Sequence, residues 1–124
     1  MRSLKFTFIF LVCLLVFLSC EKNDISPGDL EVSSHDKVLK IHNRFESEIY
    51  YFVVERNTAA LINWVPRVGK NSPFVESGKT VEVNFESILG YKDDAEEAIV
   101  YYWIAIHQKG SLVPGNVHSI IVNL

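Results

Sequence analysis

Cysteine is nearly absent from this chain of 124 residues: it occurs at positions 13 and 20 and nowhere between 21 and 124. A domain built from residues 21–124 therefore has no disulfide, no zinc site with cysteine ligands and no cysteine nucleophile. Such a domain must be held together by its apolar core alone. About 90 ordered residues are enough to build a core of that kind.

An excess of basic residues is also missing. The sequence has 12 Lys and Arg against 15 Asp and Glu. All fifteen acids follow Cys20, whereas two of the bases precede it, so the residues after Cys20 have ten bases and a net charge of −5. Proteins that bind nucleic acid or adsorb to anionic membranes need a basic patch. The charge argues against both classes, and we expect no nucleic-acid partner.

The chain lacks an apolar run of membrane-spanning length. Its first five residues include Arg2 and Lys5 and no acid, and in the run of thirteen residues that follows, Phe6 to Leu18, only Thr7 is clearly polar. A transmembrane helix needs about 20 apolar residues. A basic start, a short apolar run and then a small residue, Ser19, are typical of a secretory signal peptide.

The junction Val16-Phe17-Leu18-Ser19-Cys20 resembles the lipobox of bacterial lipoproteins, in which a small residue precedes an invariant cysteine. Phe17 departs from the aliphatic residue that the family prefers there. The resemblance is to small envelope lipoproteins of the Bacteroidota type. It implies that residues 1–19 are a signal peptide and that Cys20 becomes the lipid-bearing first residue, since several acyl chains give stable anchoring. The alternative is a simple secretory signal or an uncleaved anchor, with Cys20 incidental.

The segment 20–36 is rich in Asp, Glu, Ser, Pro and Gly, which predicts a lipidated N-terminus followed by a flexible tether. The folded body is expected over residues 37–124. Alternating, β-branched and aromatic runs predict strands at Val38–Asn43, Ile49–Glu55, Thr80–Phe85, Ala98–Gln108 and Val117–Leu124. Residues 59–65 fit either a sixth strand or a helical turn. Polar loops are expected at 67–77 and 86–97, and a turn at 109–116.

About six short strands separated by turn residues predict an all-β fold, a small antiparallel β-sandwich. In the strand Thr80–Phe85 the apolar residues alternate with polar ones, as in an antiparallel sheet with one face in water. The pattern resembles the immunoglobulin-like modules of envelope lipoproteins, in which a turn such as Ser77-Gly78-Lys79-Thr80 opens a strand. Trp103 is the expected core tryptophan.

Two polar motifs invite chemical interpretations that their context does not favour. Gly78-Lys79-Thr80 matches the end of a phosphate-binding loop, but that loop needs a second glycine at position 73, where Pro73 stands, and a helix afterwards. The acidic run 93–97 lacks the alternating oxygen ligands and the glycine of a calcium loop. We expect a turn entering a strand in the first case and a solvated acidic loop in the second.

Four histidines are the remaining candidates for metal ligands: His35, His42, His107 and His118. If the last hairpin pairs symmetrically about its loop, His107 faces His118 across two strands. A metal site needs at least three converging ligands, and the sequence indicates no third. We therefore expect surface histidines, no metal and no cofactor.

Two aromatic rows are the most informative feature: Tyr50-Tyr51-Phe52 and Tyr101-Tyr102-Trp103. Adjacent residues of a strand point to opposite faces, so each row places rings on both sides of a sheet. Cross-strand packing explains these rings without a ligand. The alternative is an exposed row that stacks on sugars or anchors a protein, with Trp64 as the ring expected to be exposed and with Tyr50 and Tyr102 beside it.

These observations predict a lipid-anchored protein of the cell envelope that acts as a non-enzymatic interaction module. We expect it in the outer membrane, on the periplasmic or the outer side, as a monomer held by the lipid on Cys20. Its further partner is a protein or a glycan. One alternative is an accessory carbohydrate-binding lipoprotein. Another is an enzyme or enzyme inhibitor that acts through the loops 67–77 or 86–97. No catalytic residue can be assigned, because no Gly-x-Ser-x-Gly motif or comparable signature occurs.

Overall fold

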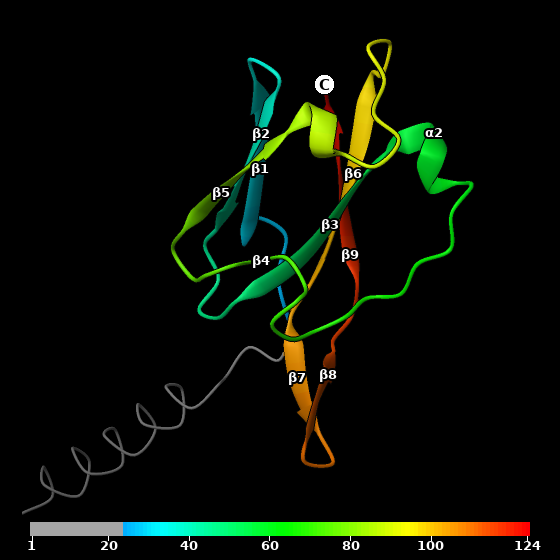
Figure 1. The fold of residues 1–124 in the computed structure, drawn as a ribbon. Helices are drawn as coiled ribbons and strands as arrows, with labels where there is room; N and C mark the ends of the chain where they lie inside the picture. Colours follow the sequence, from blue (N-terminus) through cyan, green and yellow to red (C-terminus); the bar gives the residue numbers. More distant parts are fainter. Residues whose placement is uncertain (1–23) are drawn as a thin grey trace, which may run out of the picture.

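The computed structural model describes residues 24–124, and these residues contain nine β-strands and two short helical turns (Figure 1). The strands are β1 (Leu30–His35), β2 (Val38–Asn43), β3 (Ile49–Glu55), β4 (Phe74–Val75), β5 (Thr80–Asn84), β6 (Glu97–Trp103), β7 (Ala105–Gln108), β8 (Ser111–Pro114) and β9 (His118–Asn123). The helical turns are α2 (Arg56–Ala59) and η1 (Phe85–Ser87). The predicted signal peptide, Cys20 and the start of the predicted tether lie outside the described residues.

The strands form two antiparallel sheets and a separate hairpin. One sheet has the strand order β1-β2-β5, the other has the order β4-β3-β6-β9, and β7 pairs with β8. The two larger sheets enclose one apolar core, which is the arrangement of a β-sandwich. The predicted all-β fold class is therefore confirmed. The immunoglobulin-like relationship stays a prediction.

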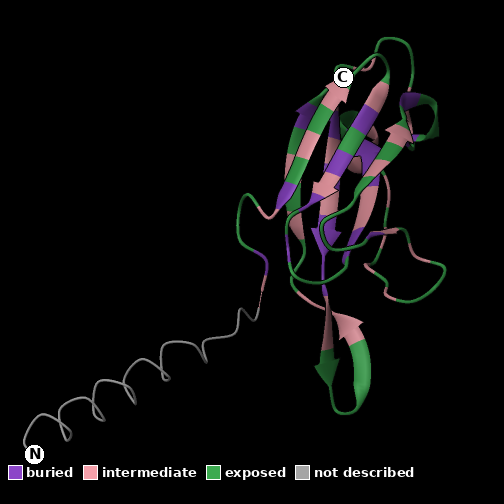
Figure 2. Ribbon diagram, turned by 90° about the vertical axis from the view of Figure 1, so that its left-hand side faces the viewer, coloured by how far each residue is buried: buried purple, intermediate pink, exposed green. Residues whose placement is uncertain are grey.

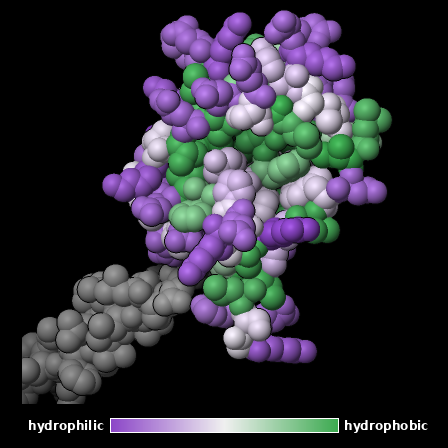
Figure 3. Space-filling view, viewed as in Figure 1, coloured by the Kyte–Doolittle hydropathy of each residue, from purple (hydrophilic) through white to green (hydrophobic). Residues whose placement is uncertain are grey.

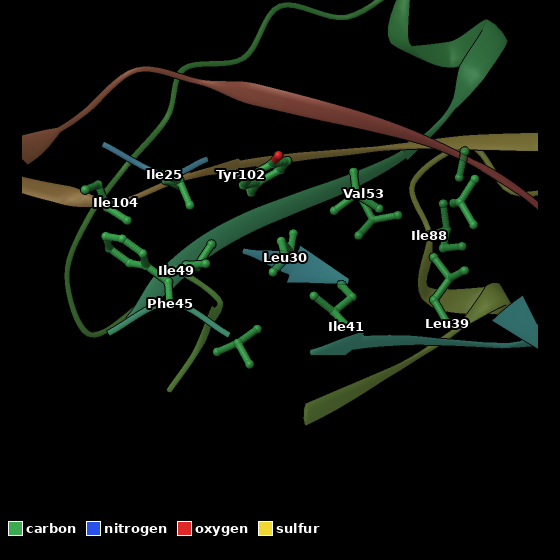
Figure 4. Close-up of a cluster of buried hydrophobic side chains, with 14 of the residues drawn as sticks. Ile25, Leu30, Leu39, Ile41, Phe45, Ile49, Val53, Ile88, Tyr102 and Ile104 are labelled. Carbon is green, nitrogen blue, oxygen red and sulfur yellow. The ribbon is translucent and has the colours of Figure 1, made fainter. Parts of the chain in front are cut away.

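The core is built from alternate positions of facing strands. The core cluster includes Leu39 and Ile41 on β2, Ile49 on β3 and Val100 on β6, and all four side chains are fully buried. Figure 4 shows this core, with Leu39, Ile41 and Ile49 among the labelled side chains. Figure 2 shows the resulting alternation of buried and exposed residues along the strands. The alternation follows from the two-residue repeat of a strand. Burial of one such side chain contributes roughly 1.5–3 kcal/mol to the free energy of unfolding. Burial of the core side chains as a whole is therefore the main source of the stability of the domain.

The folded body begins earlier than the sequence predicts. β1 lies inside the segment 20–36 that we expected to be a tether, and it pairs with β2 along its whole length. Ile25 and Leu30 are buried in the core. The tether prediction is therefore wrong for residues 24–36. β1 has few apolar residues, and they follow Pro27 and Gly28. Its sequence pattern therefore resembles that of a loop, and its strand structure depends on the pairing with β2.

The C-terminal strands also differ from the prediction. The expected strand Ala98–Gln108 is two strands, β6 and β7, which are separated at Ile104. There the backbone carbonyl of Ile104 accepts a hydrogen bond of 2.7 Å from the N–H of Gly115, which closes the base of the β7–β8 hairpin. β8 occupies the middle of the region 109–116, where the sequence predicted only a turn.

The β7–β8 hairpin extends away from one end of the sandwich in both ribbon views (Figures 1 and 2). Its tip is a two-residue turn of Lys109 and Gly110, which have φ values of 50° and 79°. Two consecutive residues with positive φ make the turn type whose twist matches antiparallel strands. Within residues 24–124, no helix has both the length and the apolar character needed to cross a bilayer.

Candidate functional site

A groove of about 490 Å³ lies on the face of β3 and β6 that points away from the core. Its walls come from β3, β6 and the segment 60–73, which follows α2 and runs across this face. The lining residues are Tyr51, Phe52, Asn63, Trp64, Val65, Arg67, Asn71, Ser72, Pro73 and Trp103. The floor is aromatic because the register pairs rings on this face, Tyr50 with Trp103 and Phe52 with Tyr101. The cross-strand aromatic packing expected from the sequence is thus present.

Trp64 is the ring that the segment 60–73 adds to this aromatic floor. Its centroid lies 4.9 Å from that of Phe52, 4.7 Å from that of Tyr101 and 5.7 Å from that of Trp103. Each such pair contributes about 0.5–1.5 kcal/mol beyond the area that it buries. Trp64 is therefore half-buried. The expectation of an exposed ring is wrong, because the strip of rings on β3 and β6 offers it a packing surface.

Hydrogen bonds fix the segment over the sheet. The indole N–H of Trp103 donates to the carbonyl of Arg67 at 2.9 Å, and the N–H of Gly69 donates to the hydroxyl of Tyr50 at 3.4 Å. Gly69 has a φ of 122°, a conformation that residues with a Cβ rarely adopt. Trp103 is buried, as predicted, but beneath this segment and not between the two sheets. These contacts hold the groove in a formed state without a ligand.

The rim of the groove is polar. Asn63, Arg67 and Asn71 are exposed, and Ser72 is half-buried. The amides offer donors and acceptors, and the guanidinium offers donors only. Burial raises the pKa of Tyr51, so its phenol stays protonated at neutral pH. The lining set contains no carboxylate, imidazole or amine side chain. An aromatic floor under polar side chains is suited to binding a ligand that has an apolar face and hydrogen-bonding groups.

Tyr50 and Tyr102 do not line the groove beside Trp64. Both tyrosines are 5% exposed, and they point to opposite sides of the sheet. Tyr50 packs on Trp103 and Phe74, whereas Tyr102 belongs to the core and stacks on His118. Burial raises the pKa of Tyr102, and the negative charges of Asp29 and Asp24 raise it further. Of the three residues expected to form a ligand surface, only Trp64 lines the groove.

A second hollow, of about 720 Å³, lies between α2 and the loop that contains the acidic run 93–97. The carboxylate of Glu55 accepts hydrogen bonds of 2.9 Å from the N–H groups of Asn57 and Thr58. The bond from Thr58 is the main cause that lowers the pKa of Glu55, against the effect of burial. Arg56 pairs with Glu97 at 2.7 Å. These contacts cap α2 and fix it to β6, so Glu55 and Glu97 have structural partners.

His107 and His118 do not face each other, as they would in a hairpin that pairs symmetrically about residues 109–116. His107 lies opposite Leu112 and His118 lies opposite Tyr102, because the chain leaves the β3–β6 sheet at Ile104 and pairs with itself beyond it. The other two histidines have local partners: His42 with the hydroxyl of Thr80 and His35 with Asp36. Among residues 24–124, no cluster of three or more His, Cys, Asp or Glu side chains could hold a metal ion.

The turn at Gly78 opens a strand, as the sequence predicts. Gly78 has a φ of 74°, the N–H of Lys79 donates to the carbonyl of Glu76 at 3.0 Å, and β5 starts at Thr80. A phosphate loop aims its backbone amides at phosphate from the start of a helix. Since a strand follows here, Gly78-Lys79-Thr80 cannot act in that way.

One cluster of polar side chains was not foreseen. The carboxylate of Asp24 accepts a hydrogen bond of 3.1 Å from the amide of Asn116 and lies 3.1 Å from Nε2 of His118. Burial raises the pKa of Asp24, but the hydrogen bonds from Asn116, Ile25 N–H and His118 outweigh it, and the pKa is lowered. The cluster joins residues 92 and 94 positions apart. No local pattern could have indicated it.

Comparisons of the chain with protein-family models, with curated proteins and with solved structures found no match.

Proposed function

We propose that this chain is a lipid-anchored protein of the bacterial cell envelope that acts as a non-enzymatic binding module. The observation that supports binding is the groove beside Trp64, which is formed, apolar at its floor and polar at its rim. Grooves of a few hundred Å³ with an apolar lining and a few polar groups are the usual form of ligand sites. The lipid anchor rests on the sequence pattern that ends at Cys20.

Metabolic labelling tests the anchor. Cells that express the chain and are fed an alkyne analogue of palmitate should label it, and a Cys20→Ala variant should not be labelled. Protease treatment of intact cells then assigns the side of the membrane, because only an outward-facing domain is degraded without lysis. Label that persists in the variant would remove the anchor from the proposal.

Cross-linking from the rim of the groove tests the binding module in cells. A photo-reactive amino acid is placed at Asn63, or at Asn84 as a matched control. Both asparagines are exposed, but Asn84 lies on β5, in the other sheet. We expect a discrete cross-linked product from position 63 and none from position 84. Equal products from both positions would contradict a specific site at the groove.

A saccharide is the second candidate ligand, and the chemistry of the groove favours it. A sugar ring has an apolar face that stacks on an aromatic ring and hydroxyl groups that bond to amides and guanidinium groups. Trp64, Asn63, Asn71 and Arg67 provide these groups around one groove. Titration of the purified domain with oligosaccharide fragments should shift its tryptophan fluorescence. An Asn71→Ala variant should weaken binding, whereas Asn57→Ala, also exposed but on α2, should not.

A further inference from the structure

The hairpin β7–β8 presents apolar side chains outside the core of the sandwich. Leu112 is 54% exposed, Val117, just after the hairpin, is 41% exposed, and Val113 is half-buried, whereas Ile106 packs against the core. Figure 3 shows hydrophobic side chains on the hairpin above a hydrophilic tip. The hairpin thus projects from the sandwich with part of its apolar surface exposed. It is suited to contact with something outside the domain.

The start of the described chain lies at the base of this hairpin. Asp24 is hydrogen-bonded to Asn116, which lies between β8 and β9, and to His118, the first residue of β9. Cys20 precedes Asp24 by four residues, and four residues span at most about 14 Å. β7 has four residues, which at a rise of about 3.3 Å each gives a strand of about 13 Å. The length of the hairpin from its base to its tip is therefore about the same as the greatest distance between Cys20 and Asp24.

We propose that the β7–β8 hairpin contacts the bilayer that holds the lipid of Cys20 and inserts the side chain of Leu112 into its interfacial region. This inference rests on the proposed lipid anchor. It assigns a second point of attachment, so that the domain has a fixed orientation on the membrane and does not turn freely about one tether. The groove beside Trp64 would then be held at a defined side of the molecule.

The charge pattern supports an apolar contact in place of electrostatic adsorption. The chain from Ala98 to its end contains no Asp or Glu, and Lys109 at the hairpin tip is its one Lys or Arg. Leu112 pairs with His107 in the outer half of the hairpin and borders a hollow of about 580 Å³ that is also lined by Glu46, Glu48 and Glu76. These acids oppose attraction to anionic headgroups, so the contact depends on the apolar side chain of Leu112 and not on charge. A short tether gives the hairpin an effective concentration on the order of millimolar, which suffices for a weak apolar contact.

A paramagnetic lipid tests the proposal independently of lipidation in cells. The chain from Cys20 to Leu124 has one cysteine, so its thiol can be coupled to a maleimide lipid in phosphatidylcholine nanodiscs. A gadolinium-chelating lipid in the disc broadens the NMR signals of nearby amides. We expect selective loss of the signals of residues 106–113, with the β1–β2 turn unaffected. The loss should persist at high salt, because the contact is apolar.

Two variants at residues of similar exposure make the test specific. Leu112→Gln should restore the hairpin signals, whereas Ile121→Gln, at a residue 52% exposed on β9, should leave the loss unchanged. A uniform loss, or a loss centred on another surface, would overturn the proposal for the hairpin and leave the lipid anchor untouched. Hairpin shifts that grow with protein concentration in the absence of discs would also overturn it, since they indicate a protein contact. Failure of the anchor itself appears only in the labelling of Cys20→Ala.

Discussion

The molecule contains two hairpins with the same kind of turn at its opposite ends (Figure 1). In β1–β2 the turn residues Asp36 and Lys37 have φ values of 50° and 62°, and in β7–β8 the turn residues Lys109 and Gly110 have φ values of 50° and 79°. The flanking strands differ. β1–β2 pairs over six residues in each strand and places Leu39 and Ile41 in the core, whereas β7–β8 pairs over four and leaves Leu112 exposed.

This difference shows that the conformation of the turn does not decide the role of a hairpin in the fold. Two positive φ values fit the twist of any antiparallel pair, so they explain why both hairpins form. What each hairpin does depends on the face that its strands bury. β1–β2 is part of the sandwich and should unfold with it. β7–β8 is attached through Ile104, Gly115 and the contacts of Asp24, so it should contribute little to global stability.

The largest contrast is expected from truncation of one leucine in each hairpin. Leu39→Ala empties a fully buried position on β2, and we expect a loss of about 2–5 kcal/mol in the free energy of unfolding. Leu112→Ala removes an exposed side chain and should change that free energy by less than about 0.5 kcal/mol. Urea unfolding followed by far-UV circular dichroism measures both. Equal losses would show that β7–β8 belongs to the cooperative core.

The asparagines that end β2 and follow β8 should differ in the same direction. Asn43 is fully buried, and its amide donates hydrogen bonds of 2.8 Å to the carbonyls of Ser47 and Val75. Asn43→Ala removes these bonds and leaves the buried N–H of Phe45 and the buried carbonyl of Val75 without this partner, which should cost about 1–3 kcal/mol. Asn116 is exposed and bonds only with Asp24 among the described contacts, so Asn116→Ala should be close to neutral. A neutral Asn43→Ala variant would contradict this structural role.

Glycine at the turns should reveal which hairpin shares in global unfolding. Lys37 and Lys109 both adopt positive φ, which is strained for a residue with a Cβ. Lys37→Gly should raise the free energy of unfolding by up to about 1 kcal/mol. Lys109→Gly should leave the unfolding midpoint unchanged and instead slow hydrogen exchange of the β7–β8 amides. A shift of the midpoint by Lys109→Gly would place that hairpin inside the cooperative unit.

The sequence was sufficient for strands whose faces are decided by local alternation. β2 and β3 have the predicted bounds, and β5 ends one residue before the predicted end. β1 was missed because Pro27 and Gly28 precede a short run, and its strand structure depends on β2. β7 and β8 were misjudged because the break at Ile104 depends on a bond from Gly115. These features are decided by residues distant in the sequence or by the exit of a strand from a sheet.

The candidate site was only partly predictable for the same reason. The aromatic rows in β3 and β6 follow from the sequence, and so does their cross-strand pairing once the strands are antiparallel. The sequence does not indicate that the segment 60–73 returns across this face and brings Trp64 onto Phe52 and Tyr101. Tyr50 became a hydrogen-bond acceptor for Gly69 instead of a ligand-binding ring. Loop placement, more than strand pattern, determined which rings remain accessible.

The smallest expected effect is the pH dependence of the stability that Asp24 contributes at the base of β7–β8. Hydrogen bonds hold the pKa of Asp24 below its ordinary value of 3.8, so Asp24 stabilises the folded state above that value and loses this contribution as the pH falls through the lowered pKa. The difference in urea midpoint between the wild type and Asp24→Asn should therefore be present at neutral pH and vanish in acid. Asp36 and its partner His35 are both 86% exposed at the β1–β2 turn, so Asp36→Asn should change the urea midpoint little. Since Asp24 joins the start of the described residues to the base of β7–β8, lower hydrogen-exchange protection factors of Asn116 and His118 in acid should accompany the loss. Unchanged exchange there would mean that Asp24 does not fix the hairpin base, and the orientation inferred from that contact would have to come from the backbone bond at Ile104 alone.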